Sequence, residues 1–317
     1  MVLGRVVDKK LGALYRAGKV TGGVYLGTGQ EALSAAIGVS LRKGDVFAPL
    51  IRDGAGRFAF GESVLDVMRT WLGSRLGPMR GRDGNVHRGR PAEGILPMLS
   101  HLGAMISVVN GTLMARRSRG DANVVGAVSV GDGATSTGAF HEGLNQAAVE
   151  KLPLVLVVAN NHYAYSTPND RQFACESLLD KAAGYGVRGR ACDGVDLEDC
   201  LAVVGAAVDS ARNGDGPQLV IADLLRLCGH GEHDDAGYVS AELKASPLGR
   251  DCVKVAEEKA VSNGWGDAVE FNAMKEAKRG LVEEAVAQVL GEPGPDPFKE
   301  SWYALASKHL SETHDDV

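Results

Sequence analysis

Two oxygen-bearing side chains, each placed at the end of an apolar run, are the residues of this sequence best suited to metal chemistry. They are Asp132 and Asn161. A carboxylate and an amide oxygen suit Mg²⁺, which takes a few protein oxygens and completes its shell with water and phosphate oxygens. Gly133 and Ala134 leave room for backbone N–H groups to approach a phosphate. The pattern therefore predicts a site for a magnesium-bound diphosphate.

The elements that must position these residues are two strands joined by a helix. The runs 124–130 and 154–159 are apolar and rich in β-branched residues, as in strands buried on both faces. Between them, Thr135, Ser136 and Thr137 offer caps to a helix, whose start favours a phosphate. In an open parallel sheet, ligands bind at the carboxyl ends of the strands. We therefore expect the polar residues to meet at one edge.

The whole chain has the composition of an α/β protein. Its 317 residues are 44% hydrophobic, which is enough to bury a sizeable core. We find no internal repeat and no convincing linker. We expect a single domain over residues 1–317, built on a mostly parallel central sheet with helices on both faces. A helical carboxyl-terminal extension is expected from about residue 248.

Charge and cysteine usage narrow the class of protein further. The net charge of −6 gives no electrostatic reason to expect nucleic acid as a partner. The five cysteines show no C-x-x-C spacing, so we interpret them as reduced thiols of an intracellular protein. No apolar run is long enough to span a bilayer, and the first residues lack the apolar core of a signal peptide. These features favour a cytoplasmic enzyme without a membrane partner.

A second group of potential metal ligands lies in a short stretch that also contains Gly229 and Gly231. On its own it suggests a metal site. However, catalytic zinc histidines usually stand four positions apart on a helix, whereas the glycines here indicate a loop. The residues are His230, Glu232, His233, Asp234 and Asp235.

The stretch 129–168 resembles the thiamine diphosphate motif, in particular that of alpha subunits of the decarboxylating component of 2-oxo acid dehydrogenase complexes. The matching features are a Gly-Asp-Gly turn, a helix bearing Glu142, Leu152-Pro153, an apolar strand and Asn160 to Tyr163. The resemblance implies a thiamine diphosphate-binding fold and two cofactors, thiamine diphosphate and Mg²⁺. It assigns Mg²⁺ to Asp132, Asn161 and the carbonyl of Tyr163. It assigns the diphosphate to the backbone at Gly131, Gly133 and Ala134.

Weaker matches to the same family add three residues near the diphosphate. Arg52, in the segment GDVFAPLIRD, would pair with it as a charge-assisted donor; the alternative is a solvated surface arginine. Arg190, before Asp-Gly-x-Asp, would also reach it. His230, in Arg-x-x-Gly-His, would approach both the diphosphate and the reaction centre.

Three further residues match loops of the family that lie at the active-site mouth or around the aminopyrimidine. His87 ends a GR-x-x-x-x-H loop and would contact substrate or cofactor; the alternative is a merely exposed loop histidine. Ser100 and Leu102 belong to a segment that resembles the family's Ser-Pro-Leu-Gly turn. There the backbone binds the aminopyrimidine and the leucine holds the cofactor in its bent shape.

The chain departs from the family pattern at four positions. Ile51 replaces a tyrosine beside Arg52, and His101 replaces the proline of the turn. Gly231 replaces a regulatory serine, and Val239 replaces an arginine. Gly231 excludes phosphorylation at that point. Ile51, His101 and Val239 keep open a non-catalytic subunit that binds the cofactor without turnover.

The resemblance implies oxidative decarboxylation of a small 2-oxo acid, with acyl transfer to a lipoyl-bearing acyltransferase. In this family a separate beta subunit supplies the glutamate that activates the cofactor, so we expect an alpha–beta heterotetramer. The nearest alternative is an acetoin dehydrogenase-type alpha subunit. The sequence names neither the 2-oxo acid nor the beta subunit.

Overall fold

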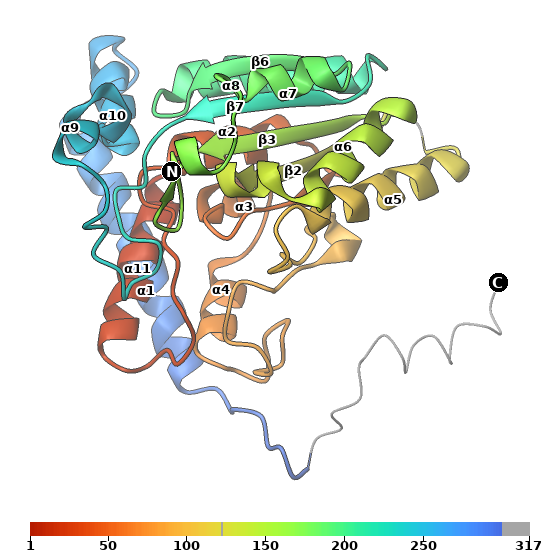
Figure 1. The fold of residues 1–317 in the computed structure, drawn as a ribbon. Helices are drawn as coiled ribbons and strands as arrows, with labels where there is room; N and C mark the ends of the chain where they lie inside the picture. Colours follow the sequence, from red (N-terminus) through yellow and green to blue (C-terminus); the bar gives the residue numbers. More distant parts are fainter. Residues whose placement is uncertain (122, 300–317) are drawn as a thin grey trace.

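The chain, described by a computed structural model over residues 1–121 and 123–299, is built on a parallel sheet. Within those residues, five strands run in the order β1-β2-β3-β7-β6 (Figure 1). All neighbouring pairs in this sheet are parallel, as predicted. The strands are β1 (Val46–Ala48), β2 (Gly126–Gly131), β3 (Leu154–Asn160), β6 (Arg188–Asp193) and β7 (Gln218–Asp223). A small antiparallel ribbon, β4 (Tyr163–Ala164) with β5 (Thr167–Pro168), follows β3.

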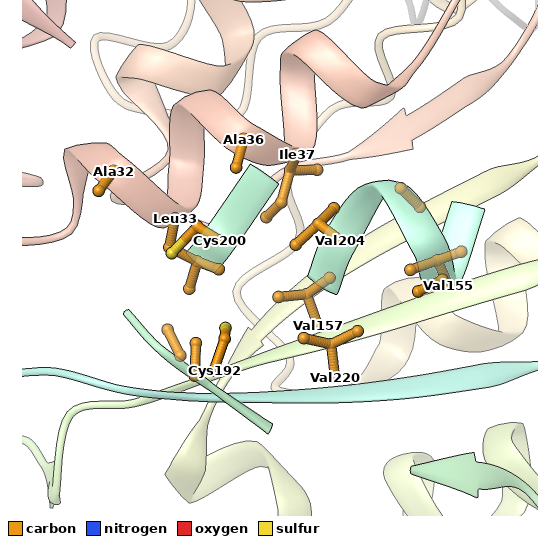
Figure 2. Packing of buried hydrophobic residues seen from close by; sticks show 14 of the residues in the cluster. Ala32, Leu33, Ala36, Ile37, Val155, Val157, Cys192, Cys200, Val204 and Val220 are labelled. Atoms are coloured by element: carbon orange, nitrogen blue, oxygen red, sulfur yellow. The ribbon is translucent and has the colours of Figure 1, made fainter. Parts of the chain in front are cut away.

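Helices cover both faces of the sheet, which confirms the predicted α/β fold class. On one face lie α2 (Glu31–Ser40) and α8 (Leu197–Arg212), whose Ile37 and Val204 pack with Val157 and Val220 of the strands (Figure 2). On the other lie α5 (Ala104–Ser118), α6 (Gly138–Val149) and α7 (Leu179–Gly184). Because successive strand residues point to opposite faces, β3 is buried along its whole length.

The remaining helices lie beside the sheet. In Figure 1, α1 (Val2–Arg16), α4 (Val64–Trp71) and α11 (Ala268–Leu290) lie together below it. They enclose an apolar core separate from the apolar layers on the two faces of the sheet. The other helices are α3 (Gly54–Ala59), α9 (Ala241–Ala245) and α10 (Cys252–Ser262). The helical extension expected from about residue 248 corresponds to α10 and α11. The single-domain organisation stays a prediction, and residues 300–317 lie outside the described part.

The connection from β2 to β3 follows the sequence prediction. Thr137, one of the three predicted caps, caps α6. Before it, Asp132–Ser136 form a 3₁₀ turn. The hydroxyl of Thr135 donates to the carbonyl of Asp132 at 2.8 Å. Such local bonds compete with the regular helix and so account for the tighter turn.

A close contact between α2 and α3 fixes the segment that carries Arg52, and it gives a stability prediction. A Cβ added at Gly38 would lie 2.2 Å from the carbonyl oxygen of Gly56. Gly38→Ala is therefore expected to lower the free energy of unfolding by about 1–3 kcal/mol. The control is Gly111→Ala on α5, where a Cβ meets open space; it should be neutral or stabilising by up to about 1 kcal/mol. Urea unfolding of both variants checks this, and equal losses would contradict it.

Candidate active site at the carboxyl edge of the sheet

The two predicted metal ligands lie at the ends of neighbouring strands. Gly131 at the end of β2 pairs in register with Ala159 of β3, so Asp132 and Asn161 leave the sheet at the same edge. Their side chains are 1% and 6% exposed, respectively. Burial of a carboxylate is unfavourable unless the group is hydrogen-bonded or paired with a positive charge.

Gln172 holds the carboxylate of Asp132. Its Nε2 donates to Asp132 Oδ2 at 2.9 Å and to the carbonyl of Thr167 at 2.8 Å. Burial raises the pKa of Asp132, and the hydrogen bond from Gln172 partly offsets that rise. Sequence reasoning did not find Gln172, because it lies on a turn after the β4–β5 ribbon with no motif of its own.

The two asparagines that end β3 have different roles. Asn160 Nδ2 donates to Asp223 Oδ1 at 2.6 Å, and its Oδ1 accepts from Asn169 Nδ2 at 2.8 Å. Asn160 therefore ties β3 to β7 and to the ribbon. Asn161 Oδ1 instead receives a long 3.4 Å contact from the backbone N–H of Tyr163. Of the two asparagines, Asn161 therefore has the side-chain oxygen that is freer to bind a ligand.

Two arginines lie beside His230 on the same side of the sheet edge. Arg52 follows β1 and Arg226 follows β7, and their side chains are 5% and 9% exposed. Arg52 Nη2 donates to the carbonyl of His230 at 2.7 Å, and Arg226 Nη2 to the carbonyl of Tyr165 at 2.8 Å. Among the described residues, neither guanidinium forms an ion pair with a carboxylate. Two buried positive charges without carboxylate partners suit an anionic ligand.

His230 is neutral in this environment. Burial, Arg52 and Arg226 lower its pKa from 6.5 to about 4. Its Nδ1 lies 3.4 Å from Arg52 Nη2 and 3.3 Å from Arg226 Nη1, both of which can only donate. Nδ1 is therefore the acceptor and Nε2 carries the hydrogen. Tyr165, with ring centroids 4.5 Å apart, packs on the imidazole.

The loop at the predicted active-site mouth is also close to this edge. His87 Nε2 lies 2.8 Å from Ser100 Oγ, and His87 Nδ1 lies 2.7 Å from Asp83 Oδ2. The side chain of Leu102 is 55% exposed, and its carbonyl accepts a hydrogen bond from Thr137 Oγ1 at 3.3 Å. The structure thus joins His87 to Ser100 and brings the backbone of Leu102 to the start of α6.

The structure does not bring Arg190 to this edge. Its Nη1 donates to Gln218 Oε1 at 2.6 Å and its Nη2 to Ser210 Oγ at 3.0 Å. Gln218 begins β7, so the guanidinium lies toward the amino ends of the strands, opposite Asp132. The contact with a diphosphate expected for Arg190 is therefore absent from this arrangement. Lys181, which sequence reasoning missed, donates to the carbonyl of Thr135 at 2.6 Å and adds a cation near the turn instead.

The acidic and histidine-rich stretch after Arg226 does not gather into a metal centre. Asp234 Oδ2 accepts from the backbone N–H of His230 at 2.5 Å, and Glu232 pairs with Arg16. Across residues 1–121 and 123–299, no group of three or more His, Cys, Asp or Glu side chains is arranged to hold a metal ion. The stretch therefore acts as a loop that positions His230. Over the same residues, no helix has the length and apolarity needed to cross a membrane.

The residues present fit Mg²⁺ and a diphosphate. Gln172 Oε1 and His162 Nε2, both buried near Asp132, have no hydrogen-bond partner in the part of the chain that the structure describes. His162 Nε2 lies 3.6 Å from Asp223 Oδ1, too far for a hydrogen bond. A Cβ built at Gly131 meets open space, whereas one at Gly133 would lie 2.6 Å from the Cβ of Ala164. The edge therefore has unused polar atoms, an open approach to the backbone and an oxygen donor set that Mg²⁺ prefers.

A buried carboxyl behind Arg52 gives a pH prediction. Asp8 Oδ2 accepts from the N–H of Gly27 at 2.7 Å, and burial raises the pKa of Asp8 to about 7. The folded pKa exceeds the unfolded value, so stability present below about pH 4 is lost as the pH rises toward 7. Asparagine does not ionise, so Asp8→Asn should not lose this stability. Near pH 7 the variant should be more stable than the wild type by a few kcal/mol. Urea unfolding from pH 4.5 to 7.5 tests it, with exposed Asp170→Asn as control. Parallel pH profiles for wild type and Asp8→Asn would contradict it.

Comparison with known proteins agrees with this geometry. The family model described as "Dehydrogenase E1 component" matches residues 1–298. The alpha subunit of acetoin:2,6-dichlorophenolindophenol oxidoreductase from Cupriavidus necator is 32% identical, over 92% of this chain and 88% of its own length. The alpha subunit of the pyruvate dehydrogenase E1 component from Rhizobium meliloti is 31% identical, over 93% and 85%. The alpha subunit of 2-oxoisovalerate dehydrogenase from Bacillus subtilis is 34% identical, over 78% and 77%. The chain therefore belongs to the dehydrogenase E1 component family, a family of thiamine diphosphate-dependent oxidoreductase subunits.

Proposed function

We propose that this chain is the alpha subunit of a thiamine diphosphate-dependent 2-oxo acid dehydrogenase that assembles with a beta subunit into a heterotetramer. The observation that carries the proposal is that one edge of the sheet holds both a buried carboxylate and two buried arginines, which have no carboxylate partner among residues 1–121 and 123–299. A lipoyl-bearing acyltransferase would take the acyl group, and the complex would work in the cytoplasm.

In this proposal each group at the edge has one task. Asp132, Asn161 and the carbonyl of Tyr163 hold Mg²⁺. The backbone at Gly131, Gly133 and Ala134 holds the diphosphate, whose charge Arg52 and Arg226 neutralise. When bound, thiamine diphosphate supplies the electron sink for decarboxylation.

His230 has a separate task beside the reaction centre. Because its Nδ1 accepts from two arginines, it presents Nε2–H as a hydrogen-bond donor. With a pKa of about 4 it keeps this form at neutral pH and stabilises an oxygen that gains negative charge. Leu102 and His87 line the mouth through which the substrate enters.

A second candidate substrate is acetoin. The relative from Cupriavidus necator is named for acetoin, and its identity to this chain is close to that of the pyruvate and 2-oxoisovalerate relatives. A non-catalytic subunit is the remaining alternative, because Ile51, His101 and Val239 depart from the family pattern.

One assay tests these possibilities together. The chain is mixed with a candidate beta subunit, thiamine diphosphate and Mg²⁺, and reduction of an artificial electron acceptor is followed with pyruvate, branched-chain 2-oxo acids and acetoin. We expect turnover with at least one 2-oxo acid and none with Asp132→Ala. A preference for acetoin would establish the second candidate. Cofactor binding in a formed complex without turnover would overturn catalysis.

A further inference from the structure

Asp83, His87 and Ser100 form a hydrogen-bonded chain of three side chains in the long loop before α5. Asp83 Oδ2 lies 2.7 Å from His87 Nδ1, and His87 Nε2 lies 2.8 Å from Ser100 Oγ. Asp83 itself is held in place, because its Oδ1 accepts from the backbone N–H of Asn85 at 2.8 Å. Asp83 and His87 are each about 30% exposed, and Ser100 is exposed. The chain thus runs from an anchored carboxylate to an accessible hydroxyl.

The donors and acceptors in this chain fix the tautomer of His87. A carboxylate only accepts, so Asp83 requires a hydrogen on Nδ1 of the imidazole. The neutral ring then has a lone pair on Nε2, and Ser100 Oγ–H must donate to it. This is the order of roles that makes a histidine the base for a serine hydroxyl, with the carboxylate as orienting group.

The turn that carries Ser100 is joined to the segment that follows Asp132. Ser100 begins the turn that ends at Gly103, the residue before α5. The carbonyl of Leu102 in this turn accepts from the hydroxyl of Thr137, which caps α6 directly after the 3₁₀ turn of Asp132. The exposed hydroxyl of Ser100 thus lies on a turn that packs against the start of α6.

We propose that Asp83, His87 and Ser100 are a proton relay whose substrate-facing group is the hydroxyl of Ser100. The proposal rests on the proposed function and adds a proton acceptor to it. Ser100 Oγ would accept the proton of a hydroxyl group on the substrate, either one formed from the keto oxygen of a 2-oxo acid or that of a hydroxyketone; the electron pair of the broken O–H bond would stay on the substrate oxygen. The Oγ–H proton passes at the same time to Nε2 of His87, and the imidazolium is stabilised by the carboxylate of Asp83. Ser100 is the catalytic residue of this step, and His87 and Asp83 are positioning residues that act through it.

The first test reads the tautomer without the cofactor. In the full chain labelled with ¹⁵N-histidine, the neutral ring of His87 is expected to show hydrogen on Nδ1, with the resonance assigned by its absence in His87→Gln. Asp83→Asn should shift the ring toward the Nε2–H form, and Asp83→Glu should restore the original pattern. An Nε2–H ring in the unmodified chain would overturn the relay.

The second test uses the assembled enzyme with its beta subunit. General acid–base catalysis is worth roughly 10²–10⁴-fold, so Ser100→Ala should lower kcat by about 100-fold or more. KM and the affinity for thiamine diphosphate should change less than about twofold, and Asp83→Asn should lower kcat with partial rescue in Asp83→Glu. Ser118→Ala, an exposed serine at the end of α5, is the matched control and should keep kcat.

The two tests separate this proposal from the proposed function. Full kcat in Ser100→Ala, in an enzyme that turns over a 2-oxo acid, would overturn the relay alone. Absence of turnover in the unmodified enzyme would overturn the proposed function and the catalytic role of the relay with it.

Discussion

Replacing Asp132 with asparagine is expected to weaken Mg²⁺-dependent binding of thiamine diphosphate by at least about 100-fold. Groups that merely orient metal ligands are worth 10–100-fold in metal affinity, and Asp132 is the only carboxylate in the proposed ligand set of this chain. Asparagine keeps the size of the side chain but removes its charge. Calorimetric titration of thiamine diphosphate at fixed Mg²⁺ measures the effect directly, and turnover should fall with it.

The stability of Asp132→Asn distinguishes loss of a ligand from loss of the fold. Burial raises the pKa of Asp132, so its ionised form is unfavourable in the cofactor-free chain at neutral pH. The variant should therefore unfold at the same urea concentration as the wild type or a higher one. The exposed Asp170→Asn is the matched control and should keep both affinity and stability. Unchanged affinity in Asp132→Asn would refute the metal site.

Those parts of the site that follow directly from strand ends could be predicted from the sequence. The run before Asp132 and the run before Asn161 are β-branched and apolar, so both had to be buried strands. A short helical connection between them then forces a parallel pair, because the chain must return to the same end of the sheet. Such reasoning is local in sequence, and the structure confirms the strands and the helix.

The parts that depend on side-chain direction could not be predicted in this way. Gln172 lies 2.9 Å from Asp132 only because the β4–β5 ribbon folds back over the turn, and no sequence period records that contact. Arg226 stood in the motif around His230, but its burial beside Arg52 depends on β7 passing between β3 and β6. Arg190 has a matching segment, yet its side chain leaves the edge strand toward the other end of the sheet. A motif gives the position along the chain, whereas the strand register sets where the guanidinium points.

Replacing Arg226 with methionine is expected to lower the affinity for thiamine diphosphate by about 10–100-fold. A hydrogen bond to a charged group contributes about 1.5–3 kcal/mol, and 1.4 kcal/mol is tenfold in affinity. The same change should raise the pKa of His230 from about 4 toward its ordinary value, because one of the two guanidinium groups that depress it is gone. Calorimetry measures the affinity, and NMR titration of the histidine ring protons measures the pKa.

Arg190→Met is the control that makes this result decisive. It removes the same charge from a segment that matches the family motif, but its guanidinium is bound to Gln218 and Ser210 near the amino ends of the strands. We therefore expect its affinity for thiamine diphosphate and the pKa of His230 to stay as in the wild type. If Arg190→Met lowers the affinity for thiamine diphosphate as much as Arg226→Met does, Arg190 binds the diphosphate, as the sequence motif predicts, and the geometry is misleading. If only Arg226→Met does, the anion is bound by arginines that follow β1 and β7, and the edge strand β6 supplies none.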